Sequence, residues 1–311
     1  MEIIRNIEKF NPISASIITI GSYDGIHRGH ITVIKEVVRE AKKNNLKSVL
    51  ITFDPHPRHI IDRKNKLPLL MGINQKIDIL KTFDLDYLCI IKFDTKFSKI
   101  TPEKFLSSQL IPIFNPKYFV IGYNHHFGFR RKGNADFLFK YFSDTDVHVK
   151  IVKPISNSSN DISSTSIRKL ILQGKIKKAN EDLGSPYGFY GKVVQGFGRG
   201  KAHNFPTANL KTTEENQLLP KSGVYFVRVM NNGLNAYGMC NLGVRPTFEE
   251  NEYAIEVHIL HYGIKDLYGA TLKVEFLDRV RKEIKFSSVE NLVSQLEKDK
   301  KYCLSLIGKY N

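Results

Sequence analysis

The first half of the chain alternates short apolar runs with longer amphipathic stretches. The runs are continuous and rich in β-branched residues, and they are "SIITI" (16–20), "SVLITF" (48–53), "YLCIIKF" (87–93), "YFVIGY" (118–123) and "VHVKIVKP" (147–154). The other stretches have helical periodicity, as in residues 30–45, 76–83, 102–110 and 164–174. Continuous apolar strands separated by helices are typical of parallel sheets buried on both faces. We therefore predict an α/β N-terminal domain with a Rossmann-like parallel sheet flanked by helices.

The pattern changes after Gly184, where glycine becomes frequent and apolar residues alternate with polar ones. In "YAIEVHIL" (253–260), three β-branched residues share one strand face, while Glu256 and His258 share the other. Residues 223–240 predict a hairpin with its turn at Asn231–Gly233. We therefore predict an all-β C-terminal domain, an antiparallel Greek-key β-barrel.

The last element that the pattern predicts is a C-terminal helix. Its apolar stripe runs from Val289 to Ile307, and Ser287 and Glu290 form a capping-box pattern at its start. We place the domain boundary at Gly184, which divides the chain into residues 1–184 and 185–311.

Length and composition fit two globular domains. The chain has 311 residues, of which 41% are hydrophobic and 25% charged. It lacks an apolar run of the roughly 18 residues that a membrane span needs, and its first residues lack the apolar region of a secretory signal. Cys89, Cys240 and Cys303 are far apart and odd in number. We therefore expect a cytoplasmic protein without a membrane partner.

The net charge of +16 is compatible with a polyanionic partner or with a lysine-rich, solvated surface. The basic residues are scattered along the sequence rather than grouped in blocks, and they are not interleaved with aromatic residues at regular spacing. Nucleic acid is therefore not the expected ligand, whereas small phosphorylated substrates fit the charge.

The segment "GSYDGIHRGH" (21–30) lies where a predicted strand ends and a predicted helix begins. Ligands of parallel sheets bind beyond the carboxyl ends of the strands, and a helix N-terminus attracts anions. Gly25 and Gly29 allow close approach of a phosphate, and His27 and His30 can donate hydrogen bonds to phosphoryl oxygens. Taken alone, the two histidines could also be ordinary surface residues in a glycine turn. A zinc site is a further alternative, but no third ligand lies nearby at a spacing that suits a metal. The strand-before, helix-after context favours the anion site.

"HRGH" has the H-x-G-H signature of the nucleotidyltransferase superfamily, which includes class I aminoacyl-tRNA synthetases. A synthetase would also carry a K-M-S-K-S loop. "KFSKI" (96–100) resembles that loop only superficially, and a solvated loop is the better interpretation of it.

A second segment, "DISSTSIRKL" (161–170), places Ser164, Thr165 and Arg168 at the beginning of a predicted helix. Its hydroxyls can cap backbone donors or meet a triphosphate, and Arg168 can clamp phosphate with a bidentate fork. Taken alone, this segment is an ordinary helix start. It indicates a phosphate site only in combination with the H-x-G-H signature.

These segments resemble the bacterial FMN adenylyltransferase module. They occur in its order, together with "TFDPHPR" (52–58), "FDTKFSKITPEKF" (93–105) and "IGYNHHFGFRRKGN" (121–134). The resemblance implies transfer of AMP from ATP to FMN, giving FAD and pyrophosphate. It implies His27, His30 and Arg168 as catalytic residues and a nucleotide pocket formed by Gly21, Asp24, Gly25, Gly29, Asn124, Ser164 and Thr165. The sequence departs from the family at Ser22 and His126.

A third segment, "GKVVQGFGRGKAHNFPTANL" (191–210), is glycine-rich and basic. Such a loop can wrap phosphates with backbone N–H groups, and its candidate residues are Gly196, Gly198, Arg199, Gly200 and Lys201. Thr207 and Asn209 are two apart, so on a strand they face the same side and can share one Mg²⁺. The alternative is a glycine-rich hairpin in a barrel.

This third segment resembles the riboflavin kinase family, whose barrel carries a P-T-A-N signature. Later segments agree with the resemblance: "SGVYFVRV" (222–229), "CNLGVRPTF" (240–248) and "DLYGATLKVEFLDRVRKEIKF" (266–286). The resemblance implies ATP-dependent phosphorylation of riboflavin with Glu256 as general base, a role that suits attack by a primary hydroxyl. The same glutamate could also be an ordinary outward-facing strand residue. The sequence departs from the family at His203 and Asn204.

Taken together, the chain resembles the bifunctional riboflavin kinase/FMN adenylyltransferases. That family implies riboflavin, FMN and FAD as substrates and products, ATP as co-substrate, and Mg²⁺. Two other classes stay open: an H-x-G-H nucleotidyltransferase with a different acceptor, and a non-catalytic protein that binds flavin or nucleic acid.

Overall fold

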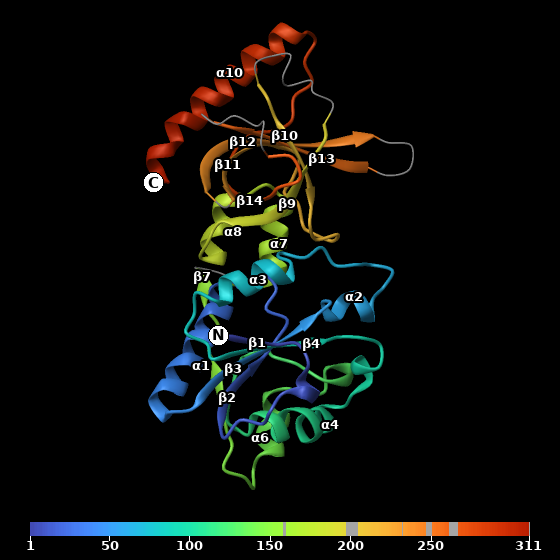
Figure 1. The fold of residues 1–311 in the computed structure, drawn as a ribbon, viewed down its shortest axis with the longest axis vertical. Helices are drawn as coiled ribbons and strands as arrows, with labels where there is room; N and C mark the ends of the chain where they lie inside the picture. Colours follow the sequence, from blue (N-terminus) through green and yellow to red (C-terminus); the bar gives the residue numbers. More distant parts are fainter. Residues whose placement is uncertain (158–159, 197–204, 232, 247–250, 261–266, 311) are drawn as a thin grey trace. The chain divides into compact units, whose positions relative to one another are not determined.

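The chain folds as two units in the computed structural model, each with its own hydrophobic core (Figure 1). The first unit consists of Met1–Leu69 and Ile73–Ser164, and the second of Leu70–Gly72 and Thr165–Asn311. The structure describes all residues except 158–159, 197–204, 232, 247–250, 261–266 and 311.

The five apolar runs of the first half form the predicted parallel sheet, which a further strand, β1, extends to six strands. Its strands are β1 (Glu2–Ile4), β2 (Ser16–Ile20), β3 (Lys47–Asp54), β4 (Tyr87–Lys92), β5 (Pro116–Gly122) and β6 (His148–Val152). Their order is β1-β4-β3-β2-β5-β6, and every neighbouring pair is parallel. From β2 the chain adds β3 and β4 on one side of that strand, and it then adds β5 and β6 on the other side. The carboxyl end of β2 is therefore the topological switch point, where ligands of such sheets bind.

Helices cover both faces of this sheet. The helices of this unit are α1 (Arg28–Asn44), α2 (Pro57–Ile61), α3 (Ile73–Leu80), α4 (Pro102–Phe105), α5 (Ile111–Phe114) and α6 (Ala135–Tyr141). Helix α1 packs along β2, β3 and β5, while a core cluster on the opposite face joins α4, α5 and α6 to the strands. Every residue of β2 is buried, which explains why its sequence is apolar without alternation.

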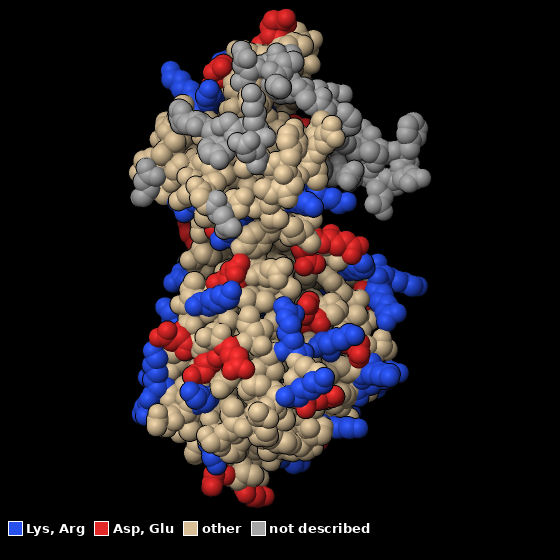
Figure 2. All heavy atoms as spheres, in the orientation of Figure 1, with Lys and Arg blue, Asp and Glu red and all other residues tan. Residues whose placement is uncertain are grey.

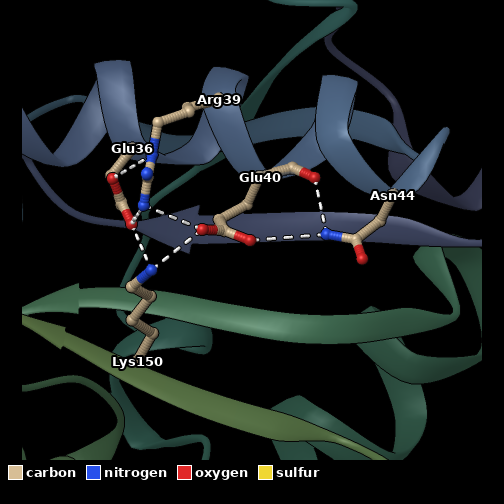
Figure 3. Close-up of polar contacts among 5 residues, drawn as sticks. All are labelled: Glu36, Arg39, Glu40, Asn44 and Lys150. Carbon is tan, nitrogen blue, oxygen red and sulfur yellow. Dashed lines mark hydrogen bonds and ion pairs between the residues drawn. The ribbon is translucent and has the colours of Figure 1, made fainter.

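A polar cluster fixes α1 to the edge strand β6 (Figure 3). The ammonium of Lys150 on β6 pairs with Glu36 and, at 2.9 Å, with Glu40, both on α1. Arg39 bonds Glu36 through Nε at 2.9 Å and Nη2 at 2.7 Å, and the Asn44 amide donates to the Glu40 carbonyl at 2.8 Å. These cationic partners lower the pKa of both carboxyl groups, that of Glu36 chiefly through Arg39 and that of Glu40 chiefly through Lys150. The cluster holds in place the helix whose first turn carries the histidine pair.

The second half forms the predicted closed barrel, whose strands pair antiparallel. Its strands are β9 (Tyr187–Val194), β10 (Ala208–Thr212), β11 (Gly223–Asn231), β12 (Leu234–Pro246), β13 (Asn251–Ile259) and β14 (Thr271–Arg281). Their order around the barrel is β10-β13-β12-β11-β14-β9. Strands β11 to β13 are consecutive neighbours and β14 returns beside β11, which is the Greek-key arrangement. The predicted hairpin is confirmed, since Asn231 pairs with Leu234 and Gly233 has a φ of +82°.

Among the described residues, the helices that accompany the barrel are α7 (Ser164–Leu172), α8 (Ile176–Leu183) and α10 (Val289–Leu306). Helix α8 packs on β9 and β14, and α10 packs on β12 and β14. The cap of α10 differs from the prediction: Ser288, not Ser287, accepts from the backbone N–H of Asn291 at 3.3 Å. Ser287 instead accepts a hydrogen bond from the Asn291 side chain. The S-x-x-E spacing therefore predicted the N-cap of α10 one residue too early.

Basic residues are scattered over the surface, as they are along the sequence. In Figure 2, lysine and arginine side chains are interspersed with acidic ones over the visible face of the N-terminal unit. Within the described parts of the chain, none of the helices is long and apolar enough to cross a membrane.

Asn180 joins α8 to the barrel. Its Nδ2 donates to the Phe276 carbonyl at 2.8 Å, and its Oδ1 accepts from the Tyr187 N–H at 2.7 Å. Asn180→Ala removes both bonds, so we expect the unfolding free energy of the C-terminal unit to fall by about 2 kcal/mol. Scanning calorimetry of the full chain measures this. Lys178→Ala, which removes the ion pairs of a more exposed lysine with Glu181 and Asp182 on the same helix, is the control, and an equal loss in both variants would contradict the assignment.

Candidate functional site

The backbone after β2 makes an unusual turn at the switch point. Tyr23 has a φ of +46° and Ile26 a φ of +38°, and Gly25 between them has a φ of +93°. Left-handed backbone is costly for residues with a side chain, above all for a β-branched one such as Ile26. Such strain persists only where the surroundings fix it, and it is characteristic of functional sites.

Several contacts fix this turn. The Tyr23 hydroxyl lies 2.6 Å from Thr19 Oγ1, the Gly21 N–H donates to the Ile51 carbonyl at 3.0 Å, and Ser164 Oγ donates to the Asp24 carbonyl at 2.8 Å. Burial of the Tyr23 hydroxyl raises its pKa, so the group stays a neutral hydrogen-bonding partner. The turn is therefore held from β2, from β3 and from the start of α7.

His27 is the N-cap of α1, which begins two residues earlier than the sequence suggests. Its Nδ1 accepts a long hydrogen bond of 3.4 Å from the His30 N–H. Because Nδ1 is the acceptor, the proton of the neutral ring lies on Nε2. A Cβ on Gly29 would lie 3.2 Å from the His27 ring, so Gly29 gives room to this imidazole. Gly25, with its left-handed φ, serves the turn itself.

The two imidazoles stack. The ring centroids of His27 and His30 are 3.7 Å apart with an interplanar angle of 19°. Burial, followed by the nearby His27 and Lys76, holds the pKa of His30 well below its usual value, so this ring is neutral at pH 7. Its Nδ1 is buried and lacks a hydrogen-bond partner within the described residues. A phosphoryl oxygen would supply the partner that a buried ring nitrogen needs.

The sequence did not reveal one residue of this site, Lys76. Its side chain is buried, and Nζ donates to the Ser22 carbonyl at 2.6 Å and lies 3.4 Å from Thr52 Oγ1. The signal was its position on the apolar face of α3, four residues before the buried Leu80. A lysine among apolar residues at helical spacing indicates a buried charge with a specific partner.

The other candidates for nucleotide binding lie as follows. Asn124 is exposed in the turn after β5, where His126 Nδ1 lies 3.0 Å from its carbonyl. Ser164 lies in the first unit and supports the Asp24 carbonyl, while Asp24 itself is buried. Thr165 and Arg168 belong to the second unit, in which Thr165 is exposed and Arg168 is buried on α7.

The second constellation is built by strand register. Asn209 on β10 pairs with Glu256 on β13, and Glu256 pairs on its other side with Asn241 on β12. Directly paired residues of antiparallel strands point to the same face, so these three polar side chains form a row. Ile255 and Val257, their neighbours along β13, are buried in the barrel, which places the row on its outer face as the alternation predicts. The sequence pattern did not indicate Asn241, in "CNLGVRPTF" (240–248), as a site residue.

Thr207 and Gly196 adjoin this row. Thr207 precedes Asn209 by two positions, at the entry to β10. A Cβ on Gly196 would lie 2.0 Å from the Asn209 side-chain nitrogen, so only glycine fits against that amide. Gly198, Arg199, Gly200 and Lys201, with His203 and Asn204, lie outside the described residues.

His258 supports the same face and was also missed. Its Nδ1 donates to the Pro206 carbonyl at 2.9 Å, which fixes the backbone just before Thr207, and burial lowers its pKa. Lys300 of α10 lies over the Phe205 ring, 5.6 Å from the centroid. The terminal helix therefore borders the row. The charge of Glu256 also acts on Cys240 behind it, whose pKa is raised by burial and secondarily by that carboxylate.

The donor set of the row fits Mg²⁺. Thr207 and Asn209 offer hydroxyl and amide oxygens, which are hard ligands, and phosphate oxygens complete the coordination of Mg²⁺ in phosphoryl-transfer enzymes. Across the part of the chain that the structure describes, no group of three or more His, Cys, Asp or Glu side chains is placed to hold a metal ion.

These features define a class of protein, an α/β nucleotidyltransferase unit joined to a phosphate-handling β-barrel. Two family models match the chain: FAD synthetase over residues 10–166 and riboflavin kinase over residues 183–307. The chain belongs to the bifunctional riboflavin kinase/FMN adenylyltransferase family.

The relatives are similar to this chain over nearly its whole length. The bifunctional riboflavin kinase/FMN adenylyltransferase of Listeria monocytogenes is 34% identical over 94% of this chain and 93% of its own. The Buchnera aphidicola protein of the same name is 32% identical over 99% and 97%. A crystal structure described as a macrolide-efflux protein from Streptococcus pneumoniae aligns with a TM-score of 0.86 at 33% identity, over 96% of this chain and 97% of that chain. Its name differs from the names of the curated relatives, while its fold is the same.

The acid stability of the first unit depends on His125, beside Asn124. Burial, followed by His126 and Arg131, lowers the pKa of His125 to about 4. An unfolded histidine binds its proton near pH 6.5, so between pH 6.5 and 4 the unfolded chain binds more protons and the unfolding free energy falls as the pH falls.

His125→Phe removes this proton uptake and keeps a ring beside Phe127. We expect the variant to lose less stability than the wild type between pH 7 and pH 4, by at most about 3 kcal/mol. Urea unfolding at both pH values measures the difference. The same pH dependence in both proteins would contradict the buried, neutral state of His125.

Proposed function

We propose that the chain converts riboflavin to FAD in two consecutive ATP-dependent steps, one in each half, with the functional boundary at Gly184. The C-terminal half, residues 185–311, phosphorylates riboflavin to FMN. The N-terminal half, residues 1–184, transfers AMP to FMN and releases pyrophosphate. Membership of the family carries the two activities. The observation that carries the assignment of residues is the stacked histidine pair at the switch point, in which His30 is neutral.

For adenylyl transfer, we assign His27 and His30 as donors to the phosphates of ATP. Both lie at the N-terminus of α1, where the helix dipole also attracts anions. In the transfer, FMN phosphate attacks the α-phosphorus of ATP and pyrophosphate leaves. Donors fixed in advance stabilise the charge that develops on the phosphoryl oxygens. A neutral His30 avoids repulsion between two stacked cations and still presents a ring N–H group.

Further residues complete the adenylyl site that we propose. Arg168 supplies a fixed positive charge for the phosphates. The pocket that we propose for the nucleotide is formed by Gly21, Asp24, Gly25, Gly29, Asn124, Ser164 and Thr165. Asp24 and Ser164 support it through the shape of the turn, because the Ser164 hydroxyl bonds the Asp24 carbonyl.

For riboflavin phosphorylation, we assign Glu256 as general base and Thr207 and Asn209 as the residues that hold Mg²⁺. Mg²⁺ held there would neutralise charge on the transferred phosphate. Glu256 takes the proton of the 5′-hydroxyl as that oxygen attacks the γ-phosphorus, and ADP leaves. The register that places Asn209 beside Glu256 supports this assignment. We assign the ATP phosphates to the loop that contains Gly196, Gly198, Arg199, Gly200 and Lys201.

The alternative of a different acceptor is disfavoured because the barrel itself matches the riboflavin kinase family. We place the protein in the cytoplasm. Its three cysteines are free and buried, which suits a reducing compartment.

The two activities are expected to separate. His30→Ala removes one donor to the phosphates, so FAD formation from FMN should fall by about 10²- to 10³-fold while FMN formation from riboflavin persists. Glu256→Gln removes the base and should reverse this pattern, lowering FMN formation by about 10²-fold or more. Initial rates of both steps, with products separated by chromatography, measure the effect. Loss of both activities in either folded variant would contradict the two-site assignment.

Thr207→Val tests the metal assignment. Losing a hydroxyl ligand should raise the Mg²⁺ concentration for half-maximal riboflavin phosphorylation by about tenfold or more, since even outer partners of metal sites cost that much. The Mg²⁺ dependence of FAD formation should not change. Thr212→Val, at the other end of β10, is the matched control. An unchanged Mg²⁺ requirement in Thr207→Val would remove this residue from the site.

A further inference from the structure

Lys76 lies beside the histidine pair but comes from a different element. It is on α3, 5% exposed, and reaches the turn that follows β2. A buried ammonium costs free energy unless strong acceptors compensate it. Its 2.6 Å bond to the Ser22 carbonyl is such a contact, and Thr52 Oγ1 donates to the same carbonyl at 3.3 Å. Two donors from α3 and β3 therefore hold one backbone oxygen.

That oxygen controls the strained turn. The Ser22 carbonyl and the Tyr23 N–H belong to one planar peptide unit, so fixing the oxygen fixes the plane from which Tyr23 enters its left-handed φ of +46°. The Tyr23 ring then meets the His30 ring edge-on, with centroids 5.0 Å apart. Contacts thus run without a gap from the Lys76 ammonium to His30.

We infer that Lys76 is a positioning residue for adenylyl transfer, which holds the Ser22 carbonyl and so fixes, through Tyr23, the ring of His30. The inference rests on the proposed function of His30. It explains why a lysine is buried on the apolar face of α3, where a methionine would pack without desolvating a charge.

The charge of Lys76 has a second effect at the same place. It opposes protonation of His30, in the same direction as the stacked His27 and after the larger effect of burial. Among the described residues, the charged or titratable groups seen to act on or contact this ring include His27, Lys76 and Tyr23. Removing the ammonium therefore changes the titration of His30 as well as the geometry of the turn.

The test compares Lys76→Met with two further variants in the full-length chain. Lys76→Met removes both the bond and the charge. Thr52→Val removes the second donor to the Ser22 carbonyl and the long 3.4 Å contact between Thr52 and Lys76, but it keeps the charge and the Lys76–Ser22 bond. Lys81→Met is the matched control, because Lys81 is exposed just after α3 and pairs only weakly with Asp78, at 3.8 Å.

For Lys76→Met we expect kcat of FAD formation to fall by about 10- to 100-fold, as a slight misplacement of catalytic donors does, with KM for ATP changing less. The pKa of His30, followed by NMR of labelled histidine, should rise. Thr52→Val should lower kcat by a smaller factor and leave the His30 pKa unchanged. Riboflavin phosphorylation, measured in the same samples, should be equal in all variants, and Lys81→Met should match the wild type.

A purely structural Lys76 would lower the melting temperature without changing kcat well below it. The inference is overturned if Lys76→Met, with kinase activity intact, keeps a wild-type kcat for FAD formation, or if its His30 pKa does not move. His30→Ala, assayed in parallel, distinguishes failure of the proposed role of His30 from failure of the role of Lys76. If it retains FAD formation, the proposed role of His30 fails. If it loses FAD formation while Lys76→Met does not, only the role of Lys76 fails.

Discussion

The left-handed turn between β2 and α1 is the constraint on which the N-terminal site depends. Tyr23 and Ile26 adopt backbone angles that residues with side chains avoid, and they do so within four residues. The turn persists because its hydroxyl and carbonyl groups are bonded from β2, β3, α3 and the start of α7. Its effect is to begin α1 at the switch point of the sheet, with His27 as cap and His30 stacked on it. The anion site that we propose is therefore a consequence of backbone shape, to which the imidazoles add hydrogen-bond donors.

The C-terminal site uses a different device, the register of an antiparallel barrel. Pairing of β10, β13 and β12 brings Asn209, Glu256 and Asn241 into one polar row on the outer face. Nothing in this row requires strain, since period-two alternation turns the intervening apolar residues inward. His258 then ties the row to the entry of β10 through the Pro206 carbonyl. In our proposal, two unrelated folds thus supply charge stabilisation to a phosphoryl-transfer and an adenylyl-transfer reaction within one chain.

The sequence predicts what local periodicity controls. It gave β2 its bounds, placed Glu256 on the outer face and located the hairpin at Gly233. It missed what depends on distant partners: Lys76 contacts Ser22 across 54 positions, and His258 contacts Pro206 across 52. The spacing of serines also could not decide between Ser287 and Ser288 as the cap of α10, because both precede the helix and only backbone geometry selects one. The roles of Thr165 and Arg168 rest on resemblance, since a helix start of this kind has a structural use in any protein.

The central claim is that one chain carries out both transfers in order. The most direct measurement is a time course with the purified chain, riboflavin and MgATP, in which the flavins are separated by chromatography and quantified. The account predicts that FMN forms first and FAD follows from it, with ADP and then pyrophosphate released in matching amounts. A chain that consumes no riboflavin and forms neither FMN nor FAD would contradict the account, whatever the geometry of its two sites.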